Sequence, residues 1–354
     1  MIDTASLQCI LNSITGVIVQ DVEALRLPGD AGNRAYYRVF WKETLSSKSL
    51  ILMVLAEPEG FKGSEEAVSG AASPITELPF INIHRHLHAS HVAVPKILYY
   101  GPERGWLLLE DLGDITLAEA VTETPDKVLP LYRHAIDELI AIQRFATPVI
   151  GTPTLAHYRA FDQALFVWEF DHFIEYGIEK REGILLLDKT KKEIRGFFSD
   201  IALRLSMLPP VFVHRDYHSR NLMIKEQDKI RVIDFQDALM GPCQYDLASL
   251  LRDAYIDLPE EVIDDLILYY LAQWEEQTGE KVAYGFFREM FDLISIQRNL
   301  KAAGRFVYID QVKKKAQFLP YVPKTLAKVK RNLEKHKRLK PLLDLLSKYV
   351  KELR

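Results

Sequence analysis

The stretch that decides the fold is His214-Arg215-Asp216-Tyr217-His218-Ser219-Arg220-Asn221, which is followed after a short gap by Ile233-Asp234-Phe235. Apolar runs at 211–213, 222–224 and 230–233 surround these residues, and a polar turn at 225–229 joins the last two runs. Short apolar runs bounded by turn residues are typical of β-strands. We therefore predict that Asn221 and Asp234 flank a hairpin.

The spacing of these polar residues matches the layout H-R-D-x-x-x-x-N followed by D-F, which is typical of kinase-type phosphoryl transfer. That chemistry needs an aligned acceptor oxygen and a cation that neutralises the phosphates, and Mg²⁺ takes oxygen ligands. We interpret Asp216 as the base for the acceptor hydroxyl, and Asn221 and Asp234 as the Mg²⁺ ligands. An isolated H-x-D pair is usually a chance feature of a turn, but four matches in register favour a site.

The residues after Asp234 restrict the class of acceptor. The third residue after Ile233 is Gln236 where protein kinases have glycine, and Gly241-Pro242 and a helix start at Tyr245-Asp246 come at once. This leaves no room for the long activation segment on which protein kinases bind a peptide.

The sequence of residues 214–223, 233–238 and 245–253 resembles the aminoglycoside phosphotransferase and choline kinase superfamily. Together with residues 297–304, it is most similar to the bacterial branch that contains the anomeric N-acetylmuramate/N-acetylglucosamine kinases of cell-wall recycling. The resemblance covers about residues 27–333. It implies ATP as phosphoryl donor, Mg²⁺ as cofactor and the anomeric hydroxyl of an amino sugar as acceptor.

Length and patterning predict an α+β, protein kinase-like fold with two lobes. A chain of 354 residues exceeds the size at which single cores usually split. Residues 1–112 form the predicted β-rich lobe, with strands at 36–41, 50–56, 97–100 and 106–109 and a helix at about 77–90. Residues 113–354 form the predicted helical lobe, with helices at 129–145, 161–176, 189–208, 260–277 and 286–304.

Composition places the chain in a reducing compartment. Two cysteines cannot build a disulfide framework, the first twenty residues lack the pattern of a secretory signal, and no apolar run approaches the length of a membrane span. We expect a cytoplasmic protein.

Residues 324–354 contain eleven Lys or Arg and three Asp or Glu. We predict a basic amphipathic helix packed on the helical lobe, with polyanion binding as the alternative.

Nucleotide contacts are expected in the first lobe. The resemblance implies adenine contacts at Glu110, Asp111 and Leu112, where an apolar run ends, although such a turn can also lack a ligand. Glycines let the backbone approach phosphate closely, which makes Gly29, Gly32 and Asn33 the candidate phosphate cover. The run 50–56 lacks the lysine expected there. Arg34 and Arg38 are the preferred substitutes because a guanidinium can bind phosphate through two N–H groups, and Lys48 and Lys62 are alternatives.

The remaining candidates support the loop or bind the acceptor. We expect His214 to hold the loop backbone and Arg215 to pair with a carboxylate, with Asp246 as its candidate partner. Candidate acceptor contacts are His218, Gln236, Asp237, Arg252, Asp253 and, for a lactyl carboxylate, Arg298, although each could serve an internal ion pair.

Two other functions stay open. One is a kinase for an aminoglycoside, an amino alcohol or another small molecule. The other is a non-catalytic nucleotide-binding module, against which the intact Asp216, Asn221 and Asp234 argue.

Overall fold

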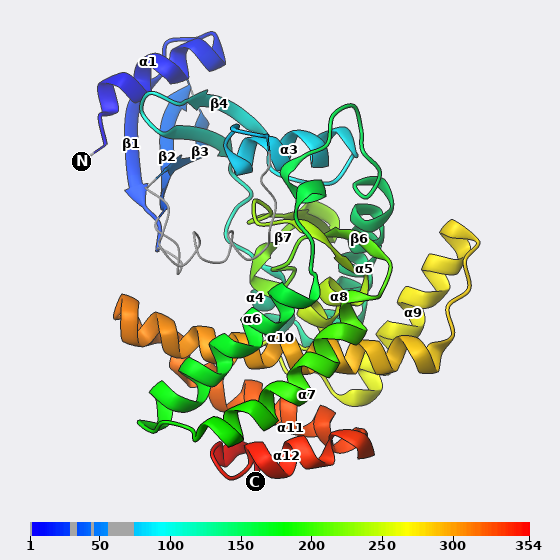
Figure 1. Ribbon diagram of the computed structural model, residues 1–354. Coiled ribbons are helices and arrows are strands. Elements are labelled where there is room, and N and C mark those ends of the chain that lie inside the picture. The colour runs from blue at the N-terminus through cyan, green and yellow to red at the C-terminus, as the bar shows by residue number, and fades with distance from the viewer. Residues whose placement is uncertain (1, 29–33, 44–45, 56–73) are drawn as a thin grey trace. The chain divides into compact units, whose positions relative to one another are not determined.

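The computed structural model describes residues 2–28, 34–43, 46–55 and 74–354 (Figure 1). It divides into two compact units, Met1–Gly63 with Val94–Asp114 and Ser64–Ala93 with Ile115–Arg354. The predicted lobe boundary at 112 lies two residues before Asp114. The division differs from the prediction in one respect, since residues 64–93 belong to the second unit.

Helix α3 (Pro79–Ala89) explains that difference. It buries Phe80 and Ile83, and its Asn82 side chain accepts a hydrogen bond from the backbone N–H of Leu155 at 2.8 Å. The ring of His86 contacts the carbonyl oxygen of Ala146 at 2.7 Å. The helix is therefore anchored by partners that come after it in the second unit.

In its described residues the first unit consists of helix α1 (Thr4–Thr15) and a five-stranded antiparallel sheet (Figure 1). The strand order is β1-β2-β3-β5-β4. The elements are α1 (Thr4–Thr15), β1 (Gln20–Arg26), β2 (Ala35–Glu43), β3 (Ser46–Val54), β4 (Ile97–Gly101) and β5 (Trp106–Glu110). The strands that the sequence predicts are confirmed, whereas α1 and β1 are additions.

The side chains of this sheet alternate between two faces. Val39, Trp41 and Leu52 are buried in one core with Leu7 and Leu11 of α1. Arg38 lies between Tyr37 and Val39 on β2, so its side chain points to the opposite face. Its cross-strand partner on β3 is Ile51.

The second unit is mainly helical and contains two two-stranded antiparallel sheets. The sheets pair β6 (Pro210–Val213) with β9 (Leu239–Pro242), and β7 (Leu222–Lys225) with β8 (Lys229–Val232). The further helices are α4 (Leu117–Glu123), α5 (Val128–Phe145), α6 (Gln163–His172), α7 (Asp188–Ser206), α8 (Gln244–Leu251), α9 (Glu260–Thr278), α10 (Tyr284–Lys313), α11 (Val322–Lys335) and α12 (Lys340–Leu346). A π-helical segment, Phe173–Lys180, continues α6. The predicted helices and the hairpin are confirmed.

Helix α10 is the centre of this unit. It runs across the unit and packs against α6, α8 and α11 (Figure 1). Its middle turns, from Met290 to Leu300, are buried without interruption. An uninterrupted buried helix can place polar side chains deep inside a unit, and α10 does so beside the loop that carries Asp216.

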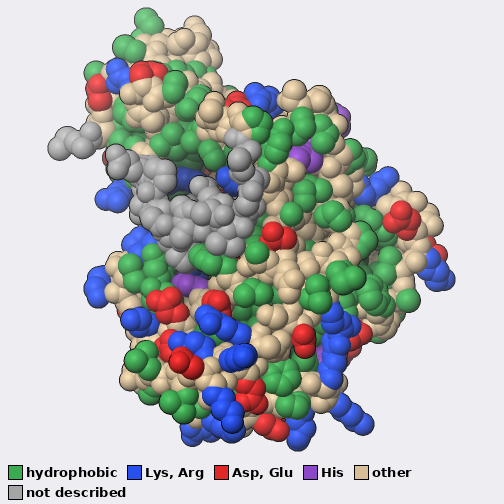
Figure 2. All heavy atoms as spheres, in the orientation of Figure 1, with side chains coloured by type: hydrophobic (Ala, Val, Ile, Leu, Met, Phe, Trp, Pro, Cys, Tyr) green, Lys and Arg blue, Asp and Glu red, His purple; other side chains and the backbone are tan. Residues whose placement is uncertain are grey.

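The basic C-terminal stretch packs within the second unit, but it forms two helices, α11 and α12, where the sequence analysis predicted a single amphipathic helix. Helix α11 buries Leu326, Val329 and Leu333, and α12 buries Leu342 and Leu346. At the lower end of Figure 2, where Figure 1 shows α11 and α12, Lys and Arg side chains alternate with Asp and Glu. The surplus of positive charge is therefore interspersed with acidic groups on this face.

Candidate active site

The loop from His214 to Asn221 runs from the end of β6 to the start of β7, and its backbone contains a strained residue. Arg215 has φ 81°, and Asp234 after β8 has φ 63°, both in the left-handed region that side chains disfavour. The carboxylate of Asp246, fully buried on α8, accepts the N–H groups of His214 at 2.7 Å and Arg215 at 2.9 Å. Asp246 therefore holds the turn that presents Asp216.

His214 connects the two halves of the candidate site. Its Nδ1 accepts the backbone N–H of Asp216 at 3.3 Å, so Nε2 carries the proton and donates to the carbonyl of Ile233 at 2.9 Å. Burial lowers the pKa of His214 to about 4. The neutral ring thus joins the residue before Asp234 to the loop that carries Asp216, which is the support role expected from the sequence.

Further hydrogen bonds bring Asn221 and Asp234 to the same place. Asn221 Nδ2 donates to the carbonyl of Asp216 at 3.0 Å, and Ile233 N–H donates to the carbonyl of Asn221 at 3.1 Å. Gln236 Nε2 donates to Oδ1 of Asp234 at 2.9 Å. The amide nitrogen of Asn221 is therefore turned toward the loop, which leaves its oxygen to face a cation.

This donor set fits Mg²⁺. An amide oxygen from Asn221 and a carboxylate from Asp234 are hard oxygen ligands, and Mg²⁺ commonly uses one or two protein ligands together with phosphates and water. In the described part of the chain there is no cluster of three or more His, Cys, Asp or Glu that could hold a metal by protein ligands alone. A cation shared with a phosphate ligand is the arrangement that these two residues support.

Asp216 remains partly exposed in a positively charged setting. Its side chain is 43% exposed, and Arg298 Nη2 lies 3.9 Å from Oδ1. Burial alone would raise the pKa of Asp216, but its electrostatic interactions with the nearby side chains of Lys301, His218 and Arg298 outweigh burial and hold the pKa well below its usual value. The carboxylate is therefore ionised and can accept a hydrogen bond from a hydroxyl.

Beneath the loop lies a buried ion cluster that the sequence interpretation missed. Glu169 of α6, fully buried, contacts Arg215 at 2.8 Å and Lys301 of α10 at 2.9 Å, and accepts a hydrogen bond from Gln297 at 2.7 Å. The expectation that Arg215 pairs with Asp246 is corrected here, because Asp246 binds the backbone N–H of Arg215 and its guanidinium contacts Glu169. Glu169 is the charged residue within the otherwise apolar run 165–170, and this was the sequence signal that could have identified it.

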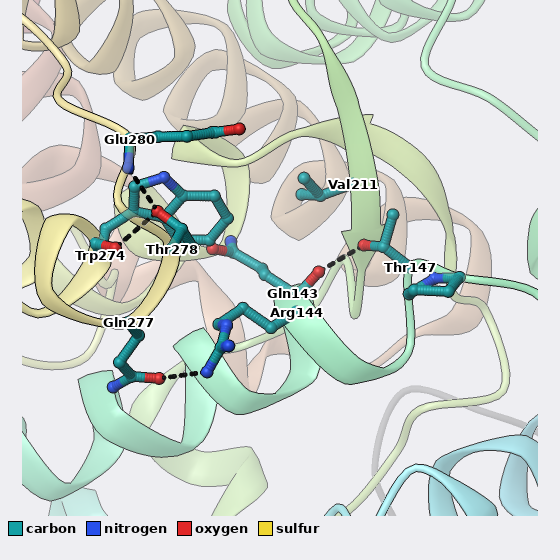
Figure 3. Close-up of a pocket in the computed structure, with 9 residues that line it drawn as sticks. Gln143, Arg144, Thr147, Val211, Trp274, Gln277, Thr278 and Glu280 are labelled. Atoms are coloured by element: carbon teal, nitrogen blue, oxygen red, sulfur yellow. Dashed lines mark hydrogen bonds between the residues drawn. The ribbon is translucent and has the colours of Figure 1, made fainter.

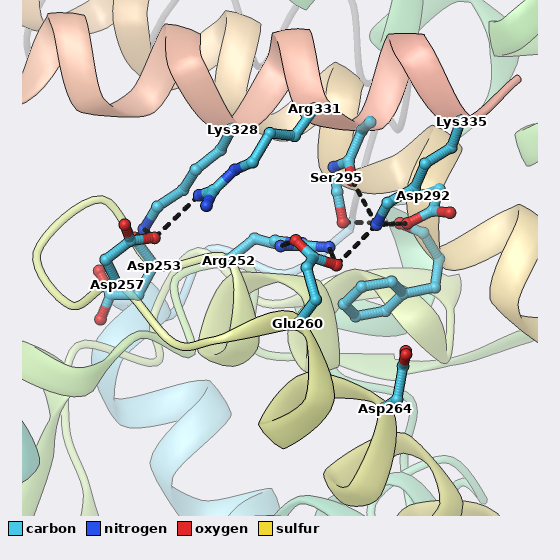
Figure 4. Close-up of polar contacts among 12 residues, drawn as sticks. Arg252, Asp253, Asp257, Glu260, Asp264, Asp292, Ser295, Lys328, Arg331 and Lys335 are labelled. Atoms are coloured by element: carbon cyan, nitrogen blue, oxygen red, sulfur yellow. Dashed lines mark hydrogen bonds and ion pairs between the residues drawn. The ribbon is translucent and has the colours of Figure 1, made fainter.

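Asp253 supports the loop from another side. It accepts the backbone N–H of Ser219 at 2.9 Å and also the Ser219 hydroxyl. Lys328 of α11 donates to the carbonyls of Asp253 and Ile256, the latter at 2.6 Å. Figure 4 shows Lys328 pointing from α11 toward this segment. Asp253, predicted to bind the acceptor, thus has an internal role, because it holds the loop two residues before Asn221.

Two other acceptor candidates also have internal partners. Arg252 is 1% exposed and pairs through two N–H groups with Glu260 at 2.5 and 2.7 Å (Figure 4). Gln236 is buried and orients Asp234 through its side-chain amide. Both side chains therefore make internal contacts, which the sequence analysis gave as the alternative to acceptor binding. Asp237, another acceptor candidate, accepts a hydrogen bond from Gln236 at 3.2 Å.

His218 lies in an aromatic cluster at the edge of the loop. The ring of Tyr255 meets His218 edge-on at 5.3 Å, and the guanidinium of Arg220 stacks on Tyr255 at 3.7 Å from the ring centre. Arg220 also donates to the hydroxyl of Tyr321 at 2.6 Å. Such an aromatic surface can pack against a sugar ring.

In the first unit, Arg38 is held by acidic partners. Its Nε lies 2.8 Å from Asp111, and its Nη2 lies 2.7 Å from Asp114. Arg38 therefore fixes the turn that leaves β5 at Glu110, next to the buried Leu112. Lys48 shares a sheet face with Leu50 and Leu52, which is the face that α1 covers, so it is not on the Arg38 face.

The other nucleotide candidates belong mostly to the part of the chain before β2. Gly29, Gly32, Asn33 and Lys62 lie outside the described residues. Arg34 immediately precedes β2 and is half-buried. These assignments stay predictions.

One hollow on the second unit lies away from this chemistry. It is formed by α5, β6 and α9, with Arg144, Trp274 and Gln277 among its lining residues (Figure 3). Arg144 donates to Gln277 at 2.9 Å, so the polar groups there bond to one another. None of the candidate site residues lines it.

None of the described helices is both long and apolar enough to cross a membrane.

Comparison with known proteins decides the family. The model of the phosphotransferase enzyme family matches residues 23–281. The chain belongs to this family. The resemblance seen in the sequence is thereby confirmed, and the chain is an enzyme of the class that transfers phosphate to a hydroxyl group.

Curated relatives extend over nearly the whole chain. The N-acetylmuramate/N-acetylglucosamine kinase of Neisseria meningitidis serogroup B is 30% identical over 339 residues, which cover 94% of this chain and 92% of that protein. The protein of the same name from Pseudomonas aeruginosa is 30% identical, over 93% of this chain and 89% of its own length.

Solved structures share the fold at lower identity. A choline kinase from Cryptosporidium parvum aligns with a TM-score of 0.59 and 12% identity, over 91% of this chain and 90% of that one. The ADP-bound aminoglycoside phosphotransferase APH(2'')-Ib aligns with a TM-score of 0.56 and 14% identity, over 92% and 98%. These likenesses confirm the predicted kinase-like architecture.

Proposed function

We propose that this phosphotransferase uses ATP and Mg²⁺ to phosphorylate a hydroxyl of an N-acetylated amino sugar, namely the anomeric hydroxyl of N-acetylmuramate or N-acetylglucosamine. The observation that carries the proposal is the convergence of Asp216, Asn221 and Asp234 through the hydrogen bonds of His214 and Ile233. The acceptor class is supported by the names of the relatives at about 30% identity.

In the proposed reaction, the acceptor oxygen attacks the γ-phosphorus, the bond to the β-phosphate oxygen breaks, and ADP leaves. Asn221 and Asp234 would hold Mg²⁺, and the bound ion would neutralise charge on the phosphates. Asp216 orients the hydroxyl and takes its proton. A carboxylate with a low pKa is a weak base, which suits an anomeric hydroxyl because that group is more acidic than an ordinary alcohol.

The test is a panel of acceptors. The purified protein is incubated with ATP, Mg²⁺ and N-acetylated sugars, aminoglycosides or amino alcohols, and ADP release is followed. Turnover confined to the N-acetylated sugars supports the proposal, and a downfield shift of the anomeric C1–H signal with splitting by phosphorus in NMR identifies the anomeric hydroxyl. Turnover on another acceptor class alone contradicts it, and bound ATP without any turnover indicates a non-catalytic module.

A further inference from the structure

Arg298 is a buried cation whose hydrogen bonding is incomplete beside the candidate base. Its side chain is 8% exposed, and its Nε has no hydrogen-bond partner among the described residues. The contact with Asp216, at 3.9 Å, is longer than a hydrogen bond. A desolvated guanidinium with an unmatched N–H group is costly, so the position favours a ligand that supplies oxygen atoms.

The charges around Arg298 leave a positive surplus. Three cations, Arg215, Arg298 and Lys301, lie around Asp216, and Arg215 and Lys301 share the single carboxylate of Glu169. The carboxylate that approaches Arg298 is the partly exposed Asp216. Burial raises the pKa of Asp246 to about 7, so this third acid carries only part of a charge near neutral pH.

The position of Arg298 indicates which part of a ligand would supply the oxygen atoms. In the proposed reaction, Asn221 and Asp234 would serve the phosphates through Mg²⁺. Arg298 instead approaches Asp216, beside which the acceptor hydroxyl would lie. Arg298 is close enough to Asp216 for one sugar to contact both side chains. An acidic sugar would bring a carboxylate to this position, and arginine binds carboxylates through two parallel N–H groups.

We propose that Arg298 binds the carboxylate of an acidic amino sugar and thereby determines preference for N-acetylmuramate over N-acetylglucosamine. This inference rests on the proposed function. The two sugars differ in the lactyl ether, so a residue that contacts its carboxylate acts on one acceptor more than on the other.

The experiment measures kcat and KM for both sugars in wild type, Arg298→Gln and Arg298→Lys. We expect Arg298→Gln to lower the ratio of kcat/KM for N-acetylmuramate over N-acetylglucosamine by at least about tenfold, mainly through KM for N-acetylmuramate. Arg298→Lys keeps the charge without the paired N–H groups and should give an intermediate ratio. Arg195→Gln removes an exposed arginine of α7 that pairs with Asp171, and should leave the ratio unchanged.

A second measurement does not depend on a variant that folds. The methyl ester of N-acetylmuramate lacks the charge, and wild type should use this ester at least about tenfold less efficiently, as kcat/KM, than the free acid. Equal losses on both sugars in Arg298→Gln would overturn the proposal and assign Arg298 to phosphoryl transfer or to Asp216. An unchanged ratio, or an ester used as well as the acid, would also overturn it. Failure of the proposed function is distinct, since wild type would then turn over neither sugar.

Discussion

At the scale of single residues, Asp216 is the side chain on which the proposed chemistry depends. Asn at this position keeps the size of the side chain but removes the negative charge and the ability to take a proton. We expect Asp216→Asn to lower kcat by about 10²- to 10⁴-fold, the usual contribution of a general base. Steady-state kinetics with the best acceptor measures this loss.

Nucleotide affinity provides the control for Asp216→Asn. The Mg²⁺ ligands Asn221 and Asp234 are unchanged, so calorimetry should give an ATP affinity close to wild type. A kcat near wild type would remove Asp216 from the reaction, and a parallel loss of ATP binding would indicate damage to the loop.

His172 offers a test of acid stability. It is buried between α6 and α10, where burial and then the charges of Arg305 and Lys301 lower its pKa to about 3. Between pH 6.5 and pH 3 the unfolded chain binds a proton at His172 that the folded state does not. The free energy of unfolding is therefore undiminished by His172 above pH 6.5 and decreases as the pH falls through this window. The loss is about 1.4 kcal/mol for each pH unit within this window.

We therefore expect His172→Phe to flatten the pH dependence of unfolding. Its ring can keep the stacking on Trp168 but does not titrate. Urea unfolding measures this difference. Between pH 7 and pH 5 the free energy of unfolding should fall by about 2 kcal/mol more in wild type than in the variant. Replacing the exposed His134 with Gln is the matched control, and equal pH slopes for wild type and His172→Phe would refute the argument.

The residues of the candidate site differ in how far the sequence could reveal them. His214, Asp216, Asn221 and Asp234 lie within one short stretch, so their spacing carries the geometry. Glu169, Arg298 and Lys301 come from α6 and α10 and meet the loop only after the unit has packed. Arg298 was singled out for its residue type, but only the structure shows that it lies beside Asp216.

At the scale of elements, amphipathic patterning predicted the long helices, while weakly patterned elements were missed. Strand β1 is an edge strand whose side chains are mostly exposed, so it lacks a clear alternation of apolar residues. Strand β9, Leu239–Pro242, contains a Gly-Pro pair that reads as a turn, but its edge position beside β6 tolerates proline. Helix α10 extends nine residues beyond its predicted end at Gly304.

Gly304 shows why the helix continues through a glycine. A Cβ atom at this position would come within 3.0 Å of the Phe173 backbone and 3.2 Å of the His172 carbonyl oxygen. The glycine therefore permits close contact between α10 and the start of the π-helical segment. A single sequence cannot distinguish this packing role from a helix end.

The contact between α11 and the 252–260 segment connects the C-terminal helix to the loop. Lys328 is 2% exposed, and methionine there would leave the buried carbonyl of Asp253 and the half-buried carbonyl of Ile256 without this donor. We expect Lys328→Met to lower the free energy of unfolding by about 1–3 kcal/mol. Because Asp253 positions Ser219, two residues before Asn221, the variant should also require more Mg²⁺ for half-maximal rate.

Lys330→Met is the matched control for this prediction. Lys330 lies on the same helix, is about one-third exposed and contacts Glu334 at 3.8 Å, so its loss should change neither quantity by much. Stability and Mg²⁺ dependence are measured by urea unfolding and by titration of the rate. A Lys328→Met protein with wild-type Mg²⁺ dependence would show that α11 stabilises the unit without acting on the metal ligands.

At the scale of the whole molecule, the distribution of charge decides between a packed basic helix and a polyanion site. The surplus of positive charge in residues 324–354 meets acidic groups of other elements. Arg331 contacts Asp257 at 2.9 Å, and Lys335 contacts Glu260 at 2.6 Å (Figure 4). Arg338 contacts Glu289 at 2.9 Å. Much of the basic charge is thus locally compensated, within a chain whose net charge is −4.

We accordingly expect no specific retention on nucleic acid. A protein that neutralises several phosphates loses affinity steeply with salt, because each contact releases counterions. The prediction is that the full chain passes through a single-stranded DNA column, and through heparin, at physiological salt. Reversing Asp257 and Glu289 to lysine should create retention that falls with salt, which is the positive control. Steep salt-dependent retention of wild type would instead mean that the α11 lysines and arginines exchange their carboxylate partners for phosphates.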